Sequence, residues 1–371
     1  MSQHQWTLLT VIGARPQWMK ASALSRRLAQ PHSLFSERIL HTGQHYSHNM
    51  SGAFFKELGL PQADHQLEVS TDPGIRMGQM MQGITDAIHH DRPDAVILYG
   101  DTDSTLAGAW AATRCGVPAV HIEAGLRSFD RAMPEEINRI LTDELSSLLF
   151  CPSKAAVEQL QREGIFTGSR PGVRVEISGD LMLDTARHFG GIPEQPADPT
   201  QRVLLTLHRP SNVDDPERLN RWIDALASSA SKKGWTIVFP VHPRTEKGFI
   251  ALFGSNWQAQ LESRGFEIHP PAGYLQMLQW LKSVDCVFTD SGGLQKEAFF
   301  MHRPAVILRT TTEWVELLDG GYAELCEDPE MLESVLSRQK PEPSLDWNVP
   351  IYGDGNAADE IAKSLEAWLK G

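Results

Sequence analysis

The chain has 371 residues, which is too long for one ordinary hydrophobic core and is typical of two domains. Its net charge of −13 argues against nucleic acid and anionic lipid as partners, so an anionic ligand would need a local cluster of donors. No apolar run approaches the roughly 18 residues that span a bilayer, and the four separated cysteines predict small core residues of a reducing, cytoplasmic protein.

Short β-branched runs alternate with amphipathic segments from the N-terminus onward. The first run lacks a preceding basic stretch and a following cleavage site, which indicates a buried strand rather than a signal peptide. Continuous apolar strands separated by helices are typical of parallel sheets covered on both faces. We expect strands over 6–12, 36–42, 94–100, 117–123, 147–151 and 173–179, with helices over 17–30, 104–115 and 135–147.

The second half repeats this alternation after residues 190–201, a stretch rich in Gly and Pro that predicts a linker. The pattern predicts an α/β protein with two Rossmann-like domains, 1–189 and 190–355, and a final helix in 356–371 that can return to the first domain. The default ligand site is then a cleft that faces the carboxyl ends of both sheets. Here we expect strands over 202–208, 235–242, 285–290 and 303–309, and a helix over 294–301.

Loops after the strands of the first domain carry reactive residues. Arg15 follows the first strand and can grip a phosphate with two hydrogen bonds. Asp101 follows the strand at 94–100, where Asp103 or Ser104 can cap the next helix. Glu123 closes an apolar strand, where a partly buried carboxylate suits acid–base work.

Three loops of the second domain have the same placement. His208 and His242 each follow a strand and precede an Arg. The sequence DSGG then opens a helix, in which Ser291 can be the cap, and Gly292 and Gly293 let backbone N–H groups approach an anion closely. This arrangement fits a diphosphate, and Glu297 in the same helix is within reach of ribose hydroxyls.

The histidines 41, 45 and 48 are the only cluster that suggests a metal. No nearby carboxylate or Cys completes a known ligand spacing, so no metal site is predicted. The sequence also lacks a Walker A loop and a GxGxxG segment after the first strand.

Nine stretches taken in order resemble the non-hydrolysing UDP-N-acetylglucosamine 2-epimerase family over nearly the whole chain. They are GARPQWMK, HTGQHYSHNM, GDTDSTLAGA, HIEAGLRS, MPEEINR, TLHRPSN, VHPRT, DSGGLQKEA and TTEWVE. The resemblance implies a glycosyltransferase-B architecture, a homodimer, a UDP-sugar substrate and no need for NAD or a metal. It further implies catalytic roles for Asp101, Glu123, Glu135 and His208, and substrate-binding roles for Arg15, Lys20, Arg139, His242, Ser291, Gly292, Gly293 and Glu297.

The implied reaction inverts C2 of a UDP-2-acetamido sugar. UDP leaves by anti elimination to give a glycal and then adds back, with the C2 proton returned to the opposite face. Such a site needs a base and an acid on opposite faces of the ring and strong stabilisation of the departing diphosphate. Which carboxylate is the acid and which the base stays open.

Three departures from the family pattern leave alternatives open. Ala14 and Gln17 replace a usual Thr and Glu, and Ser211 stands where a Glu is expected. The GARPQ form of the first loop, the LQKEAFF that follows DSGG, and Trp314 resemble a branch that acts on UDP-2,3-diacetamido-2,3-dideoxy-glucuronate, for which Gln17, Arg131 and His45 are candidate contacts. A hydrolysing relative that releases UDP and N-acetylmannosamine, a glycosyltransferase and a catalytically inactive sugar-nucleotide sensor are further alternatives.

Overall fold

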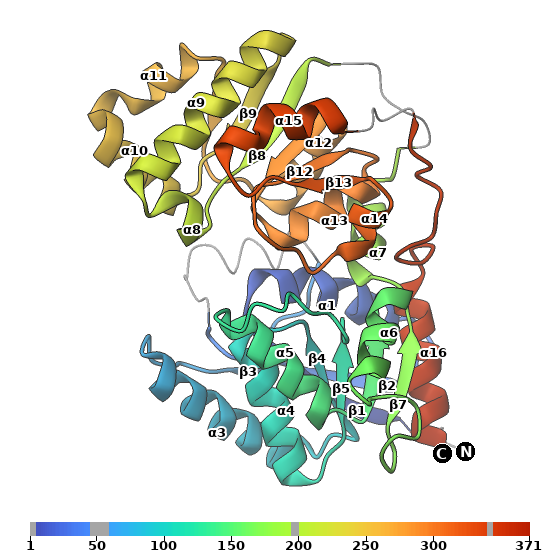
Figure 1. Cartoon of the computed structure of the whole chain (residues 1–371). Helices are drawn as coiled ribbons and strands as arrows, with labels where there is room; N and C mark the ends of the chain where they lie inside the picture. Colours follow the sequence, from blue (N-terminus) through green and yellow to red (C-terminus); the bar gives the residue numbers. More distant parts are fainter. Residues whose placement is uncertain (1–4, 45–58, 194–199, 340–343) are drawn as a thin grey trace. The chain divides into compact units, whose positions relative to one another are not determined.

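The computed structural model describes residues 5–44, 59–193, 200–339 and 344–371. The chain forms two compact units, the first from Met1–Thr185 with Pro350–Gly371 and the second from Ala186–Val349. The division falls inside α7 (Leu181–Phe189), before the stretch taken as a linker. Each unit is a parallel sheet with helices packed on it (Figure 1). No helix among the described residues is long and apolar enough to cross a bilayer.

In the first unit, the described strands form one seven-stranded sheet in which every neighbouring pair is parallel. The strands are β1 (Trp6–Ile12), β2 (Phe35–His41), β3 (His65–Gln66), β4 (Ala95–Tyr99), β5 (Ala119–Ile122), β6 (Leu148–Cys151) and β7 (Arg174–Ile177). Their order is β3-β2-β1-β4-β5-β6-β7, so the chain reverses its direction of travel between β1 and β4.

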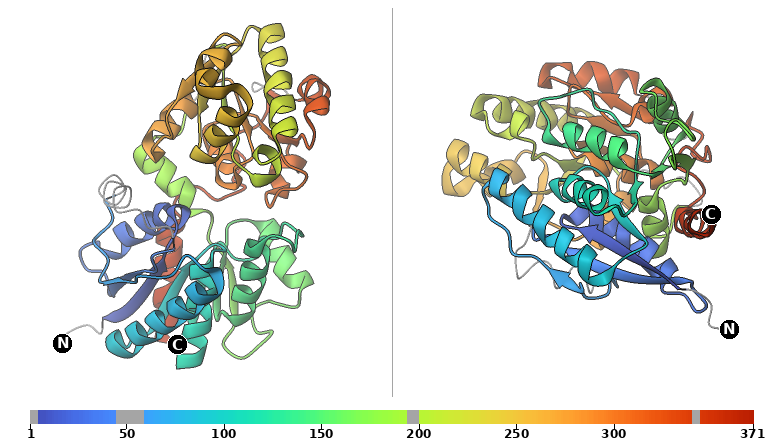
Figure 2. Two further views of the ribbon diagram at one scale, coloured as in Figure 1. Left: turned by 90° about the vertical axis from the view of Figure 1, so that its left-hand side faces the viewer. Right: turned by 90° about the horizontal axis from the view of Figure 1, so that it is seen from below.

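Helices cover both faces of this sheet, as right-handed crossovers require (Figure 2). The helices are α1 (Arg15–Leu28), α3 (Pro73–Asp91), α4 (Asp103–Cys115), α5 (Pro134–Leu145), α6 (Lys154–Arg162) and α16 (Ala357–Lys370). One core joins α3 and α4 to the sheet through residues such as Ile84 and Leu98. The late helix α16 packs against α1, where Asp359 pairs with Arg27.

The second unit repeats the plan with a six-stranded parallel sheet in the order β10-β9-β8-β11-β12-β13. Its strands are β8 (Arg202–Thr206), β9 (Thr236–Pro240), β10 (Phe266–His269), β11 (Cys286–Thr289), β12 (Ala305–Ile307) and β13 (Ala323–Leu325). Its α-helices are α8 (Pro210–Val213), α9 (Pro216–Lys233), α10 (Pro243–Phe253), α11 (Trp257–Glu262), α12 (Tyr274–Lys282), α13 (Gly292–Phe300), α14 (Val315–Asp319) and α15 (Leu332–Arg338). Trp222 and Phe239 are fully buried in its core.

The sequence predicted the central strands and the edge strand β7, and β1 has the predicted bounds. Three strands were not predicted: β3, β10 and β13. Each lies at an edge of its sheet and is short, so it has no continuous apolar run to identify it. In both units the reversal of strand order lies next to the first strand, between β1 and β4 and between β8 and β11. Ligands of open α/β sheets bind at the carboxyl ends of strands at such points.

Candidate active site

At the switch point of the first unit, Gly100 and Asp101 follow β4, and Glu123 follows the neighbouring β5. Glu123 has a φ of 72°, a left-handed conformation that is unusual for a residue other than glycine. Its backbone N–H donates to the carbonyl of Phe150 at 3.0 Å. Strained backbone of this kind collects at functional positions.

Glu123 forms an ion pair with Lys20 of α1, and each side chain is only 10% exposed. The pair lies directly against Gly100, because a Cβ built on Gly100 would lie 3.3 Å from Nζ of Lys20 and 3.6 Å from Oε2 of Glu123. Gly100 also has a φ of 64°, so a side chain there would be strained as well as crowded. The turn after β4 therefore forms a close support for the Lys20–Glu123 pair.

Asp101 pairs with Arg139 of α5, so Arg139 joins Asp101, Glu123 and Lys20 as the fourth sequence-predicted residue at this edge of the sheet. Arg139 is also 2.9 Å from Glu136. Glu136 is buried and accepts hydrogen bonds from the backbone N–H groups of Ser128 and Phe129, so its role is structural. Glu135, for which the family resemblance implies a catalytic role, is exposed in the first turn of α5.

The predicted caps of α4 are wrong. Thr102 is the N-cap residue, and its hydroxyl accepts from the N–H of Thr105. Asp103 instead pairs with Arg76 at 2.8 Å, and Ser104 is 2.7 Å from the hydroxyl of Thr42. Thr102 takes the cap because it is the last residue with extended backbone before the helix.

Gln17 is buried, and its amide is fully engaged. Its Oε1 accepts from the N–H groups of Gly13 and Ala14 at 2.8 Å and 3.0 Å, and its Nε2 donates to Tyr99 and Thr105 at 3.0 Å. The amide thus joins the turn after β1 to the end of β4. The hypothesis that Gln17 contacts a C3 acetamido group is therefore wrong. Arg131 is exposed, and His45 lies outside the described residues.

At the switch point of the second unit, His208 follows the end of β8 and Asp290 follows β11. Asp290 is fully buried and accepts from the N–H groups of His208 and Arg209 at 2.9 Å and 2.8 Å. Its Oδ1 lies 3.1 Å from Nδ1 of His208. The carboxylate fixes the imidazole and leaves Nε2 as the ring nitrogen for other chemistry.

His242 lies beside His208, with ring centroids 5.4 Å apart. Its Nδ1 accepts from the N–H of Arg244 at 3.1 Å and so caps α10. Burial, with a further contribution from His208, lowers the pKa of His242. The ring is therefore neutral at physiological pH, with Nδ1 unprotonated.

The N-terminus of α13 is arranged as an anion site. A Cβ built on Gly292 would lie 3.9 Å from a guanidinium nitrogen of Arg209 and 3.9 Å from one of Arg309, and nothing lies within 4 Å of one on Gly293. Open N–H groups at a helix start, with two Arg side chains near them, suit a phosphate. Ser291 occupies the N-cap position, but its side chain makes no capping hydrogen bond, contrary to the prediction. Glu297 is buried on the same helix.

Comparison with known proteins identifies the family. The family model for UDP-N-acetylglucosamine 2-epimerase matches residues 27–366. The UDP-2,3-diacetamido-2,3-dideoxy-D-glucuronate 2-epimerase of Pseudomonas aeruginosa is 42% identical over 96% of this chain and 99% of that protein. The chain belongs to the UDP-N-acetylglucosamine 2-epimerase family.

Solved structures agree with this membership. The crystal structure of the Methanocaldococcus jannaschii UDP-GlcNAc 2-epimerase in complex with UDP-GlcNAc and UDP is 34% identical, with a TM-score of 0.82 over 97% of this chain and 99% of that one. The MurG structure from Acinetobacter baumannii is 14% identical with a TM-score of 0.55. This likeness concerns the fold alone. The chain thus has the predicted glycosyltransferase-B type of fold, two Rossmann-like α/β units, and belongs to a family of isomerases.

Several residues at the carboxyl ends of the epimerase's second sheet were not among the predicted site residues. Glu313 holds Arg309 with two hydrogen bonds of 3.1 Å and 3.2 Å. Trp314 donates from Nε1 to the carbonyl of Gly292 at 2.9 Å, and Nζ of Lys296 lies 3.9 Å from the centroid of its ring. Arg309 is the last residue of a predicted strand, as His208 is, so the strand-end criterion applied to His208 could have found it.

Of the three histidines that suggested a metal, only His41 is described, and no group of three or more potential metal ligands occurs among the described residues. His41 is buried, and its Nδ1 accepts from the N–H of Gly43 at 3.0 Å. Burial lowers the pKa of His41 to about 4, which is consistent with a neutral structural residue. His45 and His48 lie outside the described residues.

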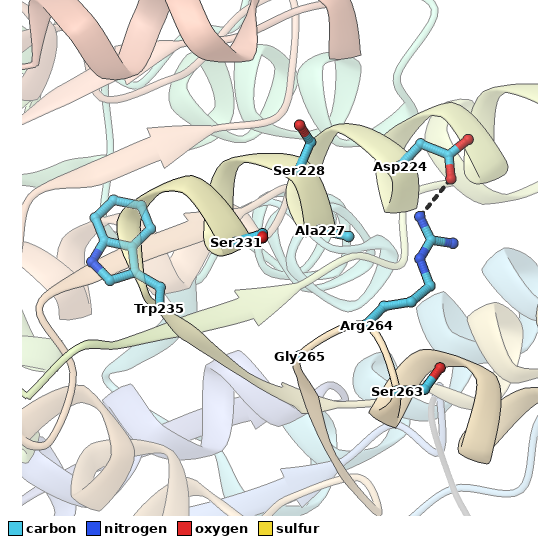
Figure 3. A pocket seen from close by; sticks show the side chains of 8 residues that line it. All are labelled: Asp224, Ala227, Ser228, Ser231, Trp235, Ser263, Arg264 and Gly265. Carbon is cyan, nitrogen blue, oxygen red and sulfur yellow. Dashed lines mark hydrogen bonds and ion pairs between the residues drawn. The ribbon is translucent and has the colours of Figure 1, made fainter.

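A pocket of about 590 Å³ in the second unit is separate from these groups (Figure 3). It lies beside α9, near Trp235 and Gly265, which precede β9 and β10. It is therefore at the amino ends of the strands. Its two charged lining residues, Arg264 and Asp224, pair with each other at 2.5 Å. The candidate anion site at the start of α13 is at the opposite end of the sheet.

Proposed function

We propose that the chain epimerises C2 of a UDP-2-acetamido sugar, of the type that converts UDP-N-acetylglucosamine to UDP-N-acetylmannosamine. The observation that carries the proposal is the open N-terminus of α13, where Gly292 lies beside Arg209 and Arg309, with Glu313 next to Arg309. This site fits the diphosphate of UDP, and Glu297 on the same helix is the candidate partner of the ribose hydroxyls. Arg15 is a further candidate for the diphosphate, and His242 for the nucleotide.

The groups of the first unit fit the sugar half of the reaction. Elimination of UDP needs a base for the C2 proton and an acid on the opposite face of the ring. Asp101, Glu123 and Glu135 are the candidate carboxylates, and the cations Lys20 and Arg139 hold the first two in place. His208, oriented by Asp290, is the candidate group of the second unit for proton transfer or for charge on the leaving diphosphate.

A second substrate deserves a test, UDP-2,3-diacetamido-2,3-dideoxy-D-glucuronate. The observation in its favour is the 42% identity with the Pseudomonas aeruginosa enzyme of that name, against 37% with the UDP-N-acetylglucosamine 2-epimerase of Methanococcus maripaludis. Because the amide of Gln17 is used by the backbone, recognition of a C3 acetamido group must come from other residues. Values of kcat/KM measured in parallel on both UDP-sugars decide the matter, and a preference of about 100-fold, roughly 2.7 kcal/mol, identifies the substrate.

The compartment, the oligomeric state and the cofactor requirement belong to the same proposal. We propose a cytoplasmic homodimer that needs neither NAD nor a metal. Support for a reducing compartment comes from the cysteines, since Cys115, Cys151, Cys286 and Cys326 are all free. Sedimentation of the purified chain tests the dimer.

Turnover in D2O tests the reaction directly. An NMR time course is expected to show an equilibrium of two intact UDP-sugars with one deuterium at C2, without added NAD and unaffected by EDTA. Release of UDP with free N-acetylmannosamine would indicate the hydrolysing relative, and transfer of the sugar to an acceptor a glycosyltransferase. Binding without turnover would indicate a sensor. Complete retention of the C2 proton would contradict the elimination route.

A further inference from the structure

His121 on β5 is a buried residue outside the proposed catalytic set, and it lies beneath the Gly100 turn. Its side chain is 0% exposed, like that of Asp143 on α5. Its Nδ1 lies 2.7 Å from Oδ1 of Asp143, and its Nε2 lies 2.7 Å from the carbonyl oxygen of Gly100. Both ring nitrogens are therefore at hydrogen-bond distance from oxygen atoms.

The partners of His121 determine its charge. The carbonyl of Gly100 can only accept, so Nε2 must carry a proton. The other oxygen of Asp143 accepts from Arg127 at 2.7 Å and from the N–H of Gly125 at 3.3 Å, as an ionised carboxylate does. An ionised Asp143 can also only accept, so Nδ1 carries a proton too.

The surrounding charges support the same assignment. Arg127 also pairs with Glu163 at 2.5 Å, so the described cluster contains two carboxylates. With His121 protonated, two cations balance these two anions. The cluster is then neutral overall, and of its four side chains only that of Glu163, which is 29% exposed, reaches solvent.

We propose that His121 is a buried imidazolium that positions the Gly100–Asp101 turn, and through it the carboxylates of Asp101 and Glu123. The inference rests on the proposed function, because it assigns the two carboxylates to the sugar chemistry. Its structural basis is that the carbonyl of Gly100 is hydrogen-bonded to His121, while Gly100 also lies against the Lys20–Glu123 pair. The same backbone continues into Asp101, whose carbonyl accepts from Asn138 at 3.0 Å. His121 is thus a positioning residue that acts through Gly100.

The charge is tested by ¹⁵N NMR of the full-length chain at about pH 8, where an ordinary histidine is neutral. The ring of His121 is assigned from through-space contacts to Gly100, so the measurement needs no variant. Two protonated ring nitrogens are the expected result. One unprotonated ring nitrogen at this pH overturns the proposal.

The positioning role is tested with His121→Gln, which can still donate one hydrogen bond but has no charge. We expect kcat to fall by about 100-fold, the cost of a displaced reacting group, while the Kd for UDP measured by calorimetry is unchanged. His90→Gln on the exposed side of α3 is the matched control and should leave kcat unchanged. A lower Tm with unchanged kcat per folded molecule would show a purely structural role and would contradict the proposal.

These outcomes are distinguishable from failure of the proposed function. If the wild-type chain turns over neither UDP-sugar, the epimerase proposal fails, and the ring measurement still decides the charge of His121. If His121→Gln does not fold, the ring of the wild-type chain still decides the proposal: one unprotonated ring nitrogen contradicts it, and two protonated ones support it.

Discussion

Nδ1 of His208 lies 3.1 Å from the carboxylate of Asp290, a fully buried residue that also accepts from the backbone N–H of His208. The carboxylate fixes both the ring and the loop that carries it. Asp290 lies inside the DSGG segment, whose serine and glycines form the start of α13. One residue therefore links the candidate acid–base group to the candidate diphosphate site.

Replacement of Asp290 by Asn should lower kcat about 10- to 100-fold, because the neutral amide no longer stabilises a protonated His208. The Asn oxygen can still accept from the backbone, so the fold should be kept. The NMR assay of epimerisation measures the loss, with exposed Asp319→Asn as the control. A wild-type kcat in folded Asp290→Asn would show that the His208–Asp290 pair has no role in the reaction.

Glu123→Gln should reduce turnover by about 10² to 10⁴, the usual range for a general acid or base. Affinity for UDP should hardly change, since Glu123 belongs to the first unit and the anion site to the second. Stopped assays and calorimetry measure the two quantities. Glu158→Gln, on the surface of α6, is the matched control. Near-normal turnover would exclude Glu123 as a catalytic group.

Glu297→Ala should have the opposite effect and weaken UDP binding about 10- to 100-fold, as expected for loss of hydrogen bonds to a charged group. Calorimetry with UDP measures Kd directly. The exposed Glu327→Ala should bind as the wild type does, because Glu327 contributes only its backbone carbonyl to a described contact. Unchanged affinity in Glu297→Ala would reject the assignment to ribose.

Glu37 provides a prediction about stability and pH. Burial raises the pKa of this carboxyl from its ordinary value of 4.5, while the hydroxyl of Thr10, at 2.5 Å, opposes the shift. A raised pKa in the folded state means that the protonated form stabilises the fold. That stability is complete below the ordinary value and is lost as the pH rises through the raised one.

Glu37→Gln should therefore raise Tm at about pH 8, where the wild-type carboxyl is forced to ionise, and the difference should vanish in acid. Thermal denaturation at both pH values measures it. Glu68→Gln, an exposed position in the same unit, should leave Tm unaltered at either pH. A lower Tm for Glu37→Gln at alkaline pH would show that the charged form is the stabilising one.

Much of the fold was predictable because the central strands are buried on both faces and read as apolar runs. The position of Asp101 and Glu123 after such strands was predictable for the same reason, since the end of a buried parallel strand is a definite place. Three of the four described edge strands were not predictable, because a strand such as His65–Gln66 carries no such run, whereas the fourth, Arg174–Ile177, was predicted.

Side-chain roles were harder to predict because they depend on partners distant in sequence. Gln17 seemed a candidate contact for the sugar, yet its Nε2 donates to Tyr99, which is 82 positions away. Glu136 and Glu135 are neighbours in sequence, but only Glu136 is buried. Nothing in the local sequence around His121 shows that it would lie between an aspartate and a carbonyl oxygen.

The return of α16 to the first unit has a consequence for synthesis on the ribosome. Residues of the second unit are contiguous in the chain, so that unit can complete its sheet while later codons are still being translated. The first unit emerges earlier but must wait for α16, whose first N–H groups donate to Asp184 and whose Asp359 pairs with Arg27. A nascent chain stalled before α16 would lack these contacts to Arg27 and Asp184, so the unit that is translated first is completed last.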